Sequence, residues 1–407
     1  MRRNTETALA VCLACALSLL GCLPAAAAAP SGPGPEKSPG MGLVPSRAEQ
    51  ARRFDARRYL AGGAGAPSAS VDLSGSVPPI GNQGPYQSCV GWATGYYAKS
   101  WYEKREHPTW NLADRRYQMS PQFVWNGING GGDNPTSIDN AMRFMENYGC
   151  TDWAQFPYDG AGFARRPDAA TYAAAEQYRI SGDWGWFFLK GRKDPDAVSG
   201  LKAWINAGNP LVMGIPIYSD FPGYGSNPAS PYYDHPGSDT TLGGHAVFVA
   251  GYDDNAGGPG RGGFLVINSW GPRWNGNGRI WLSYGFVQNH VWEAWHMSDR
   301  DSAPRVSSVT PLVGGPGQAV TIEGDNLGAC RRSARVGFQG GASGKVVTWS
   351  NRRIRVRVPS GARTGSVCVY DWEGRRSNGR TFTVGPPSNA AADWLFAEGA
   401  TWPGFDE

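Results

Sequence analysis

The chain has 407 residues, enough for two or three domains, and 41% of them are hydrophobic and 18% charged. This balance is that of a globular protein, and the 57 glycines, 31 prolines and 17 tryptophans favour a loop-rich chain with much β structure over a disordered one. The formal net charge of +4 is small for this length, and the arginines are scattered, which argues against nucleic-acid binding.

The first 29 residues are typical of a signal peptide. Two arginines stand near the start, residues 8–20 are apolar but short for a membrane span, and residues 25–29 offer small side chains for cleavage. We therefore expect the protein to be secreted or held at the cell surface. A Leu-Leu-Gly-Cys run that ends at Cys22 also resembles a bacterial lipobox, so a membrane anchor through a lipid on Cys22 stays open as the alternative.

Residues 30–70 are rich in proline, glycine and serine and contain no long helical pattern. This composition predicts a linker or a short propeptide.

Helices come next along the chain, and strands follow them. Apolar spacings of three and four, capping patterns and terminal glycines predict helices over residues 88–105, 136–149 and 194–208. Continuous apolar runs then predict strands over residues 211–217, 245–252, 263–268 and 279–284. Helices first and strands second indicate an α+β domain of two lobes over residues 71–300, and a cleft between two lobes is a natural ligand site.

A second domain is predicted over residues 304–385. Short strands are separated there by glycine, proline and asparagine, which is typical of a small all-β sandwich. The predicted strands are residues 319–322, 334–338, 346–349, 354–358, 365–370 and 381–384. Residues 386–407 hold no complete element, so we expect a tail there, and a truncated repeat is the alternative.

Cys89 is the candidate nucleophile. It follows a glycine-containing loop and stands in the first turn of a predicted helix, where the helix dipole and free backbone N–H groups lower the pKa of a thiol. The other interpretation is a disulfide, since secretion would permit one. We expect no metal and no cofactor, because the histidines lack metal-ligand spacing and no Cys-x-x-Cys motif follows the predicted signal peptide.

A nucleophilic cysteine needs a base, and His245 is the candidate among the five histidines. It alone follows a Gly-Gly pair and begins an apolar strand. Asn268 ends another predicted strand, and Trp270 stands two positions later. The asparagine oxygen can orient an imidazole, and an indole can shield that bond from water. Each feature alone is common in structural roles.

Taken in order, these residues resemble the papain family of cysteine peptidases over about residues 71–295. Gln83 precedes Cys89 by six positions, which is the spacing of that family's oxyanion glutamine. The ordered set is Gln83, Cys89, His245 and Asn268-Ser269-Trp270. Further segments that resemble the family are Met119-Ser120-Pro121-Gln122-Phe123, Phe156-Pro157-Tyr158 and Asn275-Gly276-Asn277-Gly278-Arg279-Ile280.

The resemblance implies a papain-like fold with a helical lobe and a β-barrel-like lobe. It also implies hydrolysis of protein or peptide substrates through a Cys89 thioester, with His245 as acid and base and Asn268 holding its ring. Gln83 would stabilise the oxyanion, and Ser269 and Trp270 would support the site. The pattern around Cys89 is similar to bacterial members.

Two departures from the family bear on regulation and reactivity. Val90 replaces the usual aromatic residue, and residues 85–87 replace the Cys-Gly pair that forms a disulfide in plant and animal enzymes. The family's long inhibitory prodomain is missing, which leaves open how activity is restrained.

The second domain resembles the IPT/TIG group of immunoglobulin-like folds. The resemblance rests on Ser308-Val309-Thr310-Pro311, residues 315–324, Asn326-Leu327-Gly328 and residues 354–362. It implies a binding or spacing module with a cell-surface or carbohydrate partner. Cys330 and Cys368 both lie in this domain and are a candidate disulfide pair.

We expect a monomer. Two other functions stay open at this stage: a catalytically silent papain-like binding or adhesion protein, and a cell-wall peptide hydrolase or transpeptidase that uses the same triad.

Overall fold

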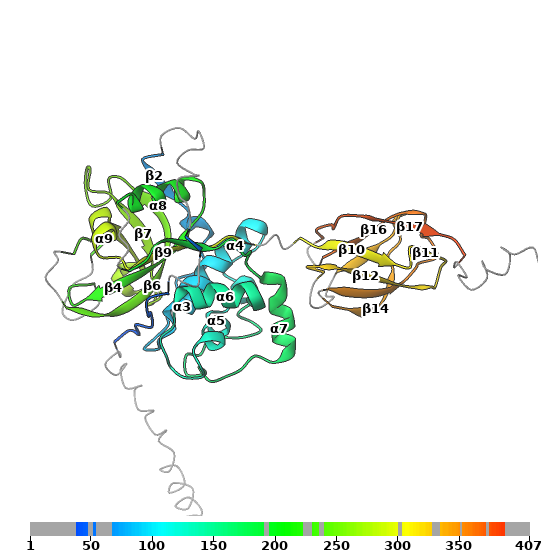
Figure 1. Ribbon diagram of the computed structural model, residues 1–407, viewed down its shortest axis with the longest axis horizontal. Coiled ribbons are helices and arrows are strands. Elements are labelled where there is room, and N and C mark those ends of the chain that lie inside the picture. The colour runs from blue at the N-terminus through cyan, green and yellow to red at the C-terminus, as the bar shows by residue number, and fades with distance from the viewer. Residues whose placement is uncertain are drawn as a thin grey trace, which may run out of the picture. The chain divides into compact units, whose positions relative to one another are not determined.

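The structure is a computed structural model, and Figure 1 shows the arrangement of its helices and strands. It describes residues 38–47, 52–53, 67–190, 195–222, 230–235, 240–299, 303–327, 334–350, 352–371 and 374–386. The predicted signal peptide, the possible lipid site Cys22 and the tail after residue 386 lie outside the described residues. None of the helices in the described ranges is long and apolar enough to cross a membrane.

A long central helix carries Cys89 at its start, as the sequence predicts. It consists of α3 (Cys89–Gly91), η3 (Trp92–Lys99) and α4 (Ser100–Glu106). The middle part has the wider π-helical turn, and all eight of its residues are buried. The predicted second helix is α6 (Ile138–Tyr148), and Gly149 ends it with a φ of +80°. The other helical elements on this side are η4 (Arg115–Tyr117), α5 (Pro121–Ile128), α7 (Ala169–Ala175) and η5 (Glu176–Tyr178).

Most of the later elements form one nine-stranded sheet in the order β1-β3-β9-β4-β6-β7-β8-β5, with β2 paired to β6. The four predicted strands are confirmed as β4 (Leu211–Tyr218), β6 (Thr241–Asp253), β7 (Gly263–Ile267) and β8 (Arg279–Ser283). The remaining strands are β1 (Arg52–Arg53), β2 (Ser70–Asp72), β3 (Gly185–Phe188), β5 (Tyr232–Tyr233) and β9 (Glu293–His296). The helical elements beside them are η2 (Ser74–Ser76), α8 (Ala197–Asn206), η6 (Trp274–Gly276) and α9 (Tyr284–Asn289).

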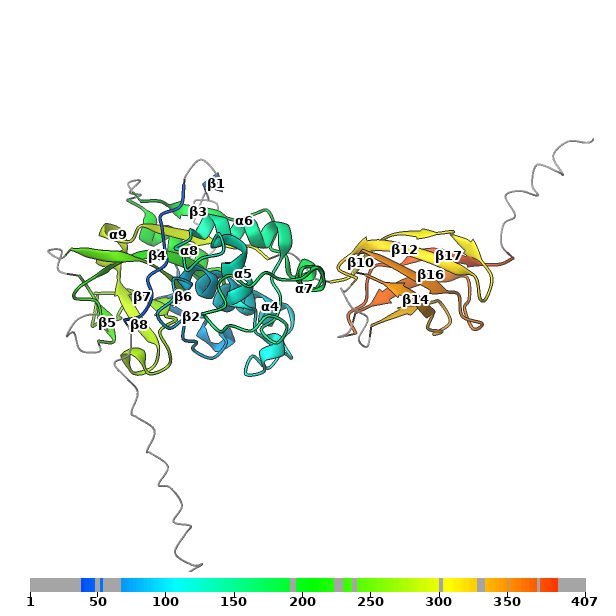
Figure 2. The same ribbon diagram turned by 90° about the horizontal axis from the view of Figure 1, so that it is seen from below.

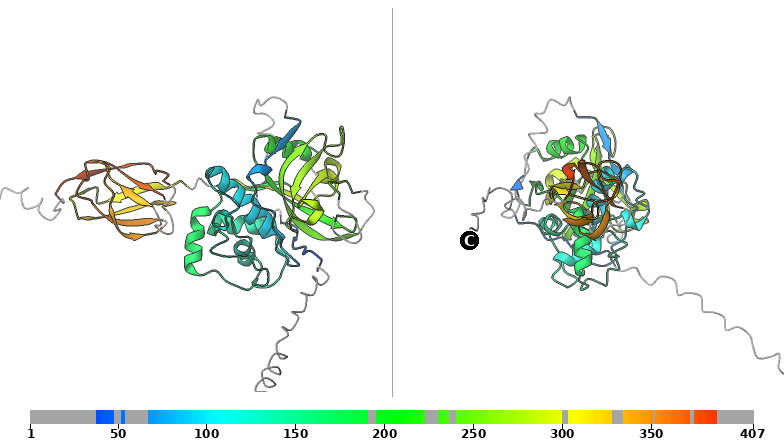
Figure 3. Two further views of the ribbon diagram at one scale, coloured as in Figure 1. Left: turned by 180° about the vertical axis from the view of Figure 1, so that it is seen from behind. Right: turned by 90° about the vertical axis from the view of Figure 1, so that its right-hand side faces the viewer.

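The domain has the two lobes that the sequence predicts. Helices α3, α5 and α6 gather on one side and strands β4, β6 and β7 on the other (Figures 1 and 3). The buried apolar residues of this domain form two clusters. The cluster with Cys89 joins the helices to one side of the sheet, and the cluster with Trp270 joins other sheet residues to α8 and α9. The catalytic candidates therefore come from different lobes and meet at the boundary.

The second domain is a sandwich of two four-stranded sheets, ordered β10-β12-β15-β14 and β11-β17-β16-β13. Apolar side chains from both sheets form one core, as expected for an immunoglobulin-like fold. Its strands are β10 (Arg305–Thr310), β11 (Val313–Gly314), β12 (Ala319–Asp325), β13 (Arg335–Gly337), β14 (Lys345–Trp349), β15 (Arg353–Arg357), β16 (Gly365–Tyr370) and β17 (Arg380–Val384).

The disulfide predicted for this domain stays a prediction. Cys368 is a buried free thiol on β16, and its sulfur lies 3.2 Å from the Ser366 hydroxyl oxygen, so its side chain is directed toward a polar neighbour on its own strand. Cys330 lies outside the described residues. Cys89 and Cys150 are buried free thiols as well, so the disulfide interpretation of Cys89 is wrong.

Candidate active site

Cys89 begins helix α3 at the boundary of the two lobes, and its side chain has no exposed surface. The backbone N–H groups of Gly42 and Ala246 donate to its sulfur at 3.3 and 3.4 Å. Burial raises the pKa of the thiol to about 11, and these hydrogen bonds only partly oppose the shift. The lowered pKa that the helix start predicts is therefore wrong for this state of the chain, because desolvation outweighs the helix terminus.

His245 lies on β6 directly before Ala246, whose N–H contacts the Cys89 sulfur. Its Nε2 is 2.7 Å from the side-chain oxygen of Asn268. Because an amide oxygen only accepts, Nε2 carries the proton, and the neutral ring then has its lone pair on Nδ1. Nδ1 is buried and has no hydrogen-bond partner among the described residues. Burial lowers the pKa of His245 to about 4, against the opposing effect of Asn268.

The surroundings of Asn268 fix its side chain and main chain. The Ser269 N–H donates to the Asn268 side-chain oxygen at 2.7 Å, and the Tyr97 hydroxyl donates to the Asn268 carbonyl at 2.8 Å. The Trp270 ring lies 4.6 Å from the His245 ring, centroid to centroid, as expected for a shield over this pair. Tyr97 cannot be recognised from the sequence as a residue of the site, since its position on the buried helix indicates only a core residue.

Ser269 makes two hydrogen bonds with Gln83, one to its side chain and one to its main chain. The Ser269 hydroxyl donates to the Gln83 side-chain oxygen at 2.6 Å, and the Gln83 N–H donates to the Ser269 carbonyl at 2.7 Å. This leaves the Gln83 side-chain NH₂ as a fixed donor, and it donates to the carbonyls of Gly40 at 3.0 Å and Tyr86 at 2.8 Å. A positioned amide donor near the start of the Cys89 helix is the feature that an oxyanion site requires.

Comparison with known proteins agrees with this arrangement. Residues 68–294 match the papain family of cysteine proteases, and residues 304–384 match the IPT/TIG domain. The chain belongs to the papain family of cysteine proteases.

Similarity to individual proteins is more distant. Xylellain, a cysteine protease from Xylella fastidiosa, superposes with a TM-score of 0.53 at 23% identity, over 66% of this chain and 100% of that one, which shows a shared fold. A peptidase C1-like protein of Acanthamoeba polyphaga mimivirus is 24% identical over 207 residues, which are 51% of this chain and 64% of that protein. A cyclomaltodextrin glucanotransferase of Niallia circulans is 27% identical over 116 residues, 27% of this chain and 16% of that enzyme. The chain thus spans less than two thirds of the length of the mimivirus protein and of the glucanotransferase.

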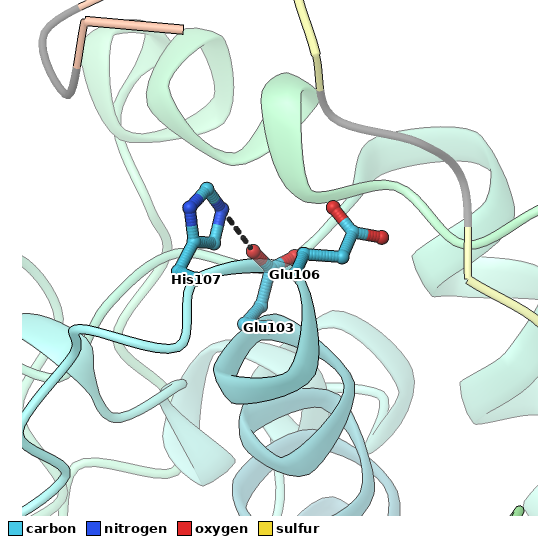
Figure 4. A group of neighbouring side chains, drawn as sticks. All are labelled: Glu103, Glu106 and His107. Carbon is cyan, nitrogen blue, oxygen red and sulfur yellow. Dashed lines mark ion pairs between the residues drawn. The ribbon is translucent and has the colours of Figure 1, made fainter.

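One group of side chains in the described ranges of this papain-family chain has the proximity of a metal site: Glu103, Glu106 and His107 (Figure 4). The Lys99 ammonium already lies 2.5 Å from Glu103 Oε1, and His107 Nε2 lies 3.3 Å from Glu103 Oε2. The cation that compensates this buried carboxylate is therefore a lysine, and we assign the group to an ion-pair network at the end of α4.

Residues 39–46, called the strap below, also lie at the papain-family site. The sequence predicts residues 30–70 as a linker or a short propeptide, but Gly40 accepts from Gln83 and Gly42 donates to Cys89. Their composition is that of a linker, and only the tertiary contacts distinguish the two possibilities.

Proposed function

We propose that the chain is a secreted cysteine endopeptidase in which Cys89 is the nucleophile and His245 is its acid and base. The observation that supports this most directly is the His245–Asn268 hydrogen bond at Nε2. It leaves His245 Nδ1 buried and without a hydrogen-bond partner among the described residues. The next residue, Ala246, donates its N–H to the Cys89 sulfur. A base must have one free nitrogen near the nucleophile and a partner that holds the other.

The reaction begins when the Cys89 thiol gives its proton to His245 Nδ1. The thiolate then attacks the carbonyl carbon of a peptide bond, and the oxyanion accepts hydrogen bonds from the Gln83 side-chain NH₂ and the Cys89 N–H. The imidazolium protonates the leaving amine as the C–N bond breaks, which yields the Cys89 thioester. His245 then takes a proton from water, and the hydroxide attacks the thioester carbon. The C–S bond breaks to release the carboxylic acid, and the imidazolium returns its proton to the Cys89 sulfur.

Asn268 keeps the His245 ring in the required tautomer throughout, and Trp270 covers this hydrogen bond. Ser269 keeps the Gln83 amide in place. These residues are positioning groups, whereas Cys89, His245 and Gln83 contact the reacting atoms.

Labelling with an epoxysuccinyl probe tests the proposal. We expect the probe to attach to Cys89 once the strap is displaced, as mapped by mass spectrometry, and casein hydrolysis to fall in parallel with labelling. Cys89→Ala removes both, whereas Cys150→Ala, a change at a buried thiol in the same lobe, retains both. An active Cys89→Ala variant would refute the assignment, and a chain with an accessible but unreactive Cys89 would indicate the silent binding protein.

The substrate class and the location form a second part of the proposal. Digestion of casein and of purified peptidoglycan separates protein hydrolysis from a cell-wall peptide hydrolase or transpeptidase with the same residues. The apolar start of the sequence supports secretion, and the IPT/TIG domain supports a cell-surface or carbohydrate partner. Glycan-array binding of the full chain tests the latter.

A further inference from the structure

We propose that the outer face of the sheet β10-β12-β15-β14 in the second domain binds a linear phosphodiester polymer of the cell surface, of the poly(glycerol phosphate) type. The location of this polymer rests on the secretion and the cell-surface partner in the proposed function, whereas the binding face rests on the strands themselves. Figures 1 and 2 show β10, β12 and β14 of this sheet in yellow to orange.

The positive charge of the chain is concentrated in the second domain. Residues 304–385 contain 13 lysines and arginines but only four aspartates and glutamates, a net charge of +9, whereas the whole chain has +4. The remainder of the chain therefore carries a net charge of −5. A charge asymmetry of this size between two parts of a chain indicates a polyanionic partner for the basic part.

Strand β15 places three arginines in a row on one face of the sheet. Ile354 and Val356 are buried in the core of the sandwich. Arg353, Arg355 and Arg357 alternate with them, so they project from the opposite face, and all three are exposed. Because alternate residues of a strand lie about 6.4–6.8 Å apart, the three side chains begin at even intervals. Arginines that are scattered in the sequence thus form a regular basic row.

The neighbouring strands add to this charge on both sides of the row. Lys345 on the edge strand β14 lies directly opposite Arg357, and Thr348 of the same strand lies opposite Arg355. On the other side, Thr321 of β12 also lies opposite Arg355. Like charges directly opposite each other destabilise a sheet, so the Lys345–Arg357 pair has a cost that a negatively charged ligand would offset.

Little of the charge in the row is neutralised within the domain. In the part of the domain that the structure describes, Glu323 is the only carboxylate within ion-pair distance of the row, and it lies 3.5 Å from Arg353 Nε. Arg357 donates to the Gly317 carbonyl at 2.9 Å, which orders this end of the row. Arg355, at the centre, makes no side-chain hydrogen bond or ion pair with the described residues, so its guanidinium donors are available to a ligand.

The residue types and their spacing favour a phosphodiester chain. Arginine suits phosphate because its planar guanidinium donates two parallel hydrogen bonds to the phosphate oxygens. A 1,3-linked poly(glycerol phosphate) has as many backbone bonds between successive phosphorus atoms as a strand has over two residues, so its extended repeat matches the row. The threonine hydroxyls beside Arg355 can donate to the same oxygens. The row therefore fits one phosphate for each arginine.

A single strand of nucleic acid has a similar phosphate spacing, but the face lacks what its bases require. Proteins bind such strands by stacking the bases on aromatic side chains. Trp349 is the one aromatic residue in the four strands of this sheet. It pairs with the core residue Ile354, and its indole N–H donates to the Leu327 carbonyl at 3.0 Å, so its ring packs inward. The outer face thus favours a polymer without bases.

The test measures binding of fluorescently labelled poly(glycerol phosphate) to the full chain over a series of salt concentrations. The variants are Arg355→Gln and its matched control Arg335→Gln. Arg335 is an exposed arginine on β13 of the other sheet, where its guanidinium lies over the Tyr370 ring. We expect Arg355→Gln to weaken binding about 3- to 10-fold at low salt. It should also lower the slope of log Kd against log salt by about 0.7, the value for one phosphate contact on a single chain. Arg335→Gln should leave Kd within about twofold and the slope unchanged.

The outcomes separate this face from other partners and from the peptidase. Equal losses in Arg355→Gln and Arg335→Gln would mean attraction by overall charge and would overturn the proposed face. Tighter binding of single-stranded DNA, of phosphatidylserine vesicles or of neutral dextran at the same salt concentration would overturn the polymer as the partner. Because binding is measured without hydrolysis, an inactive chain that binds the polymer refutes only the peptidase, and an active chain that does not bind it refutes only this face.

Discussion

The Gln83 side-chain NH₂ is expected to bind the oxyanion during the reaction, and it binds the Gly40 carbonyl of the strap in the closed chain. Its removal should therefore slow hydrolysis but make Cys89 more accessible. The Gln83→Ala variant loses a fixed donor to the oxyanion, which lowers kcat about 10²- to 10³-fold once the strap is displaced. It also loses the hydrogen bond from the Gln83 amide to the Gly40 carbonyl. A bond of this kind stabilises by about 0.5–1.5 kcal/mol, so the strap should open about 2- to 10-fold more often.

The effect on hydrolysis and the effect on the strap can be measured separately, in chains with and without the Leu43→Asp substitution. The first assay is peptide hydrolysis by Gln83→Ala in the Leu43→Asp background, where we expect the groove to be open because the strap has lost its buried apolar side chain. The second is the alkylation rate of Cys89 in Gln83→Ala alone, where the strap is intact. Gln87→Ala is the matched control, because Gln87 lies on the same loop and its amide donates to the Asp133 carbonyl instead.

We expect Gln87→Ala to change neither quantity by more than about twofold, as for substitutions away from the reacting atoms. If Gln83→Ala kept full hydrolytic activity in the open background, its amide would not contact the oxyanion. If hydrolysis fell and alkylation in the intact chain fell as well, the Gly40 contact would not hold the strap.

Further substitutions test the other groups of the site and the strap. In the Leu43→Asp background, Cys89→Ala should abolish hydrolysis while the thermal unfolding midpoint changes little, and residual turnover above the reagent blank would contradict its role as nucleophile. Asn268→Ala should lower kcat about 10²-fold or more with little change in KM, since the His245 ring loses its orientation, and an unchanged kcat would exclude that role. Burial raises the pKa of Glu293 to about 7, with Asp139 as a further like charge and Ser46 opposing the shift. The closed strap therefore favours the protonated carboxyl, and its hold weakens as pH rises through about 7. Cys89 alkylation, after correction for thiol ionisation in Leu43→Asp, should rise over this range in the natural chain and stay flat in Glu293→Gln.

Much of the fold can be predicted from the sequence where a periodic pattern is long. The helix over residues 88–105 follows from apolar spacing, and β6 follows from its continuous apolar run. The strands β3 and β9 cannot be recognised in this way. Each has only four residues, all of them buried, so no alternating pattern marks them.

The residues of the candidate site can be predicted from the sequence, but their surroundings cannot. The residues Gln83, Cys89, His245 and Asn268 can be selected from their order and spacing, and the structure brings them together. The environment of Cys89 could not be predicted, because the group that buries its sulfur includes Gly42, a residue 47 positions earlier in a segment with a linker-like composition. The direction of the thiol pKa shift depends on that tertiary contact more than on the helix start.

The pKa values of Cys89 and His245 give the strap a second effect beyond obstruction. Burial raises the first to about 11 and lowers the second to about 4, so proton transfer from the thiol to the imidazole is strongly disfavoured while the strap is in place. Gly42 supplies one of the two N–H contacts to the sulfur, and we expect its departure to admit water to both side chains. The Cys89 helix start and the Ala246 N–H remain, and both favour a thiolate once desolvation no longer dominates. Release of the strap therefore opens the groove and restores the reactive ion pair in the same step, so that a covered site is also a chemically inactive one.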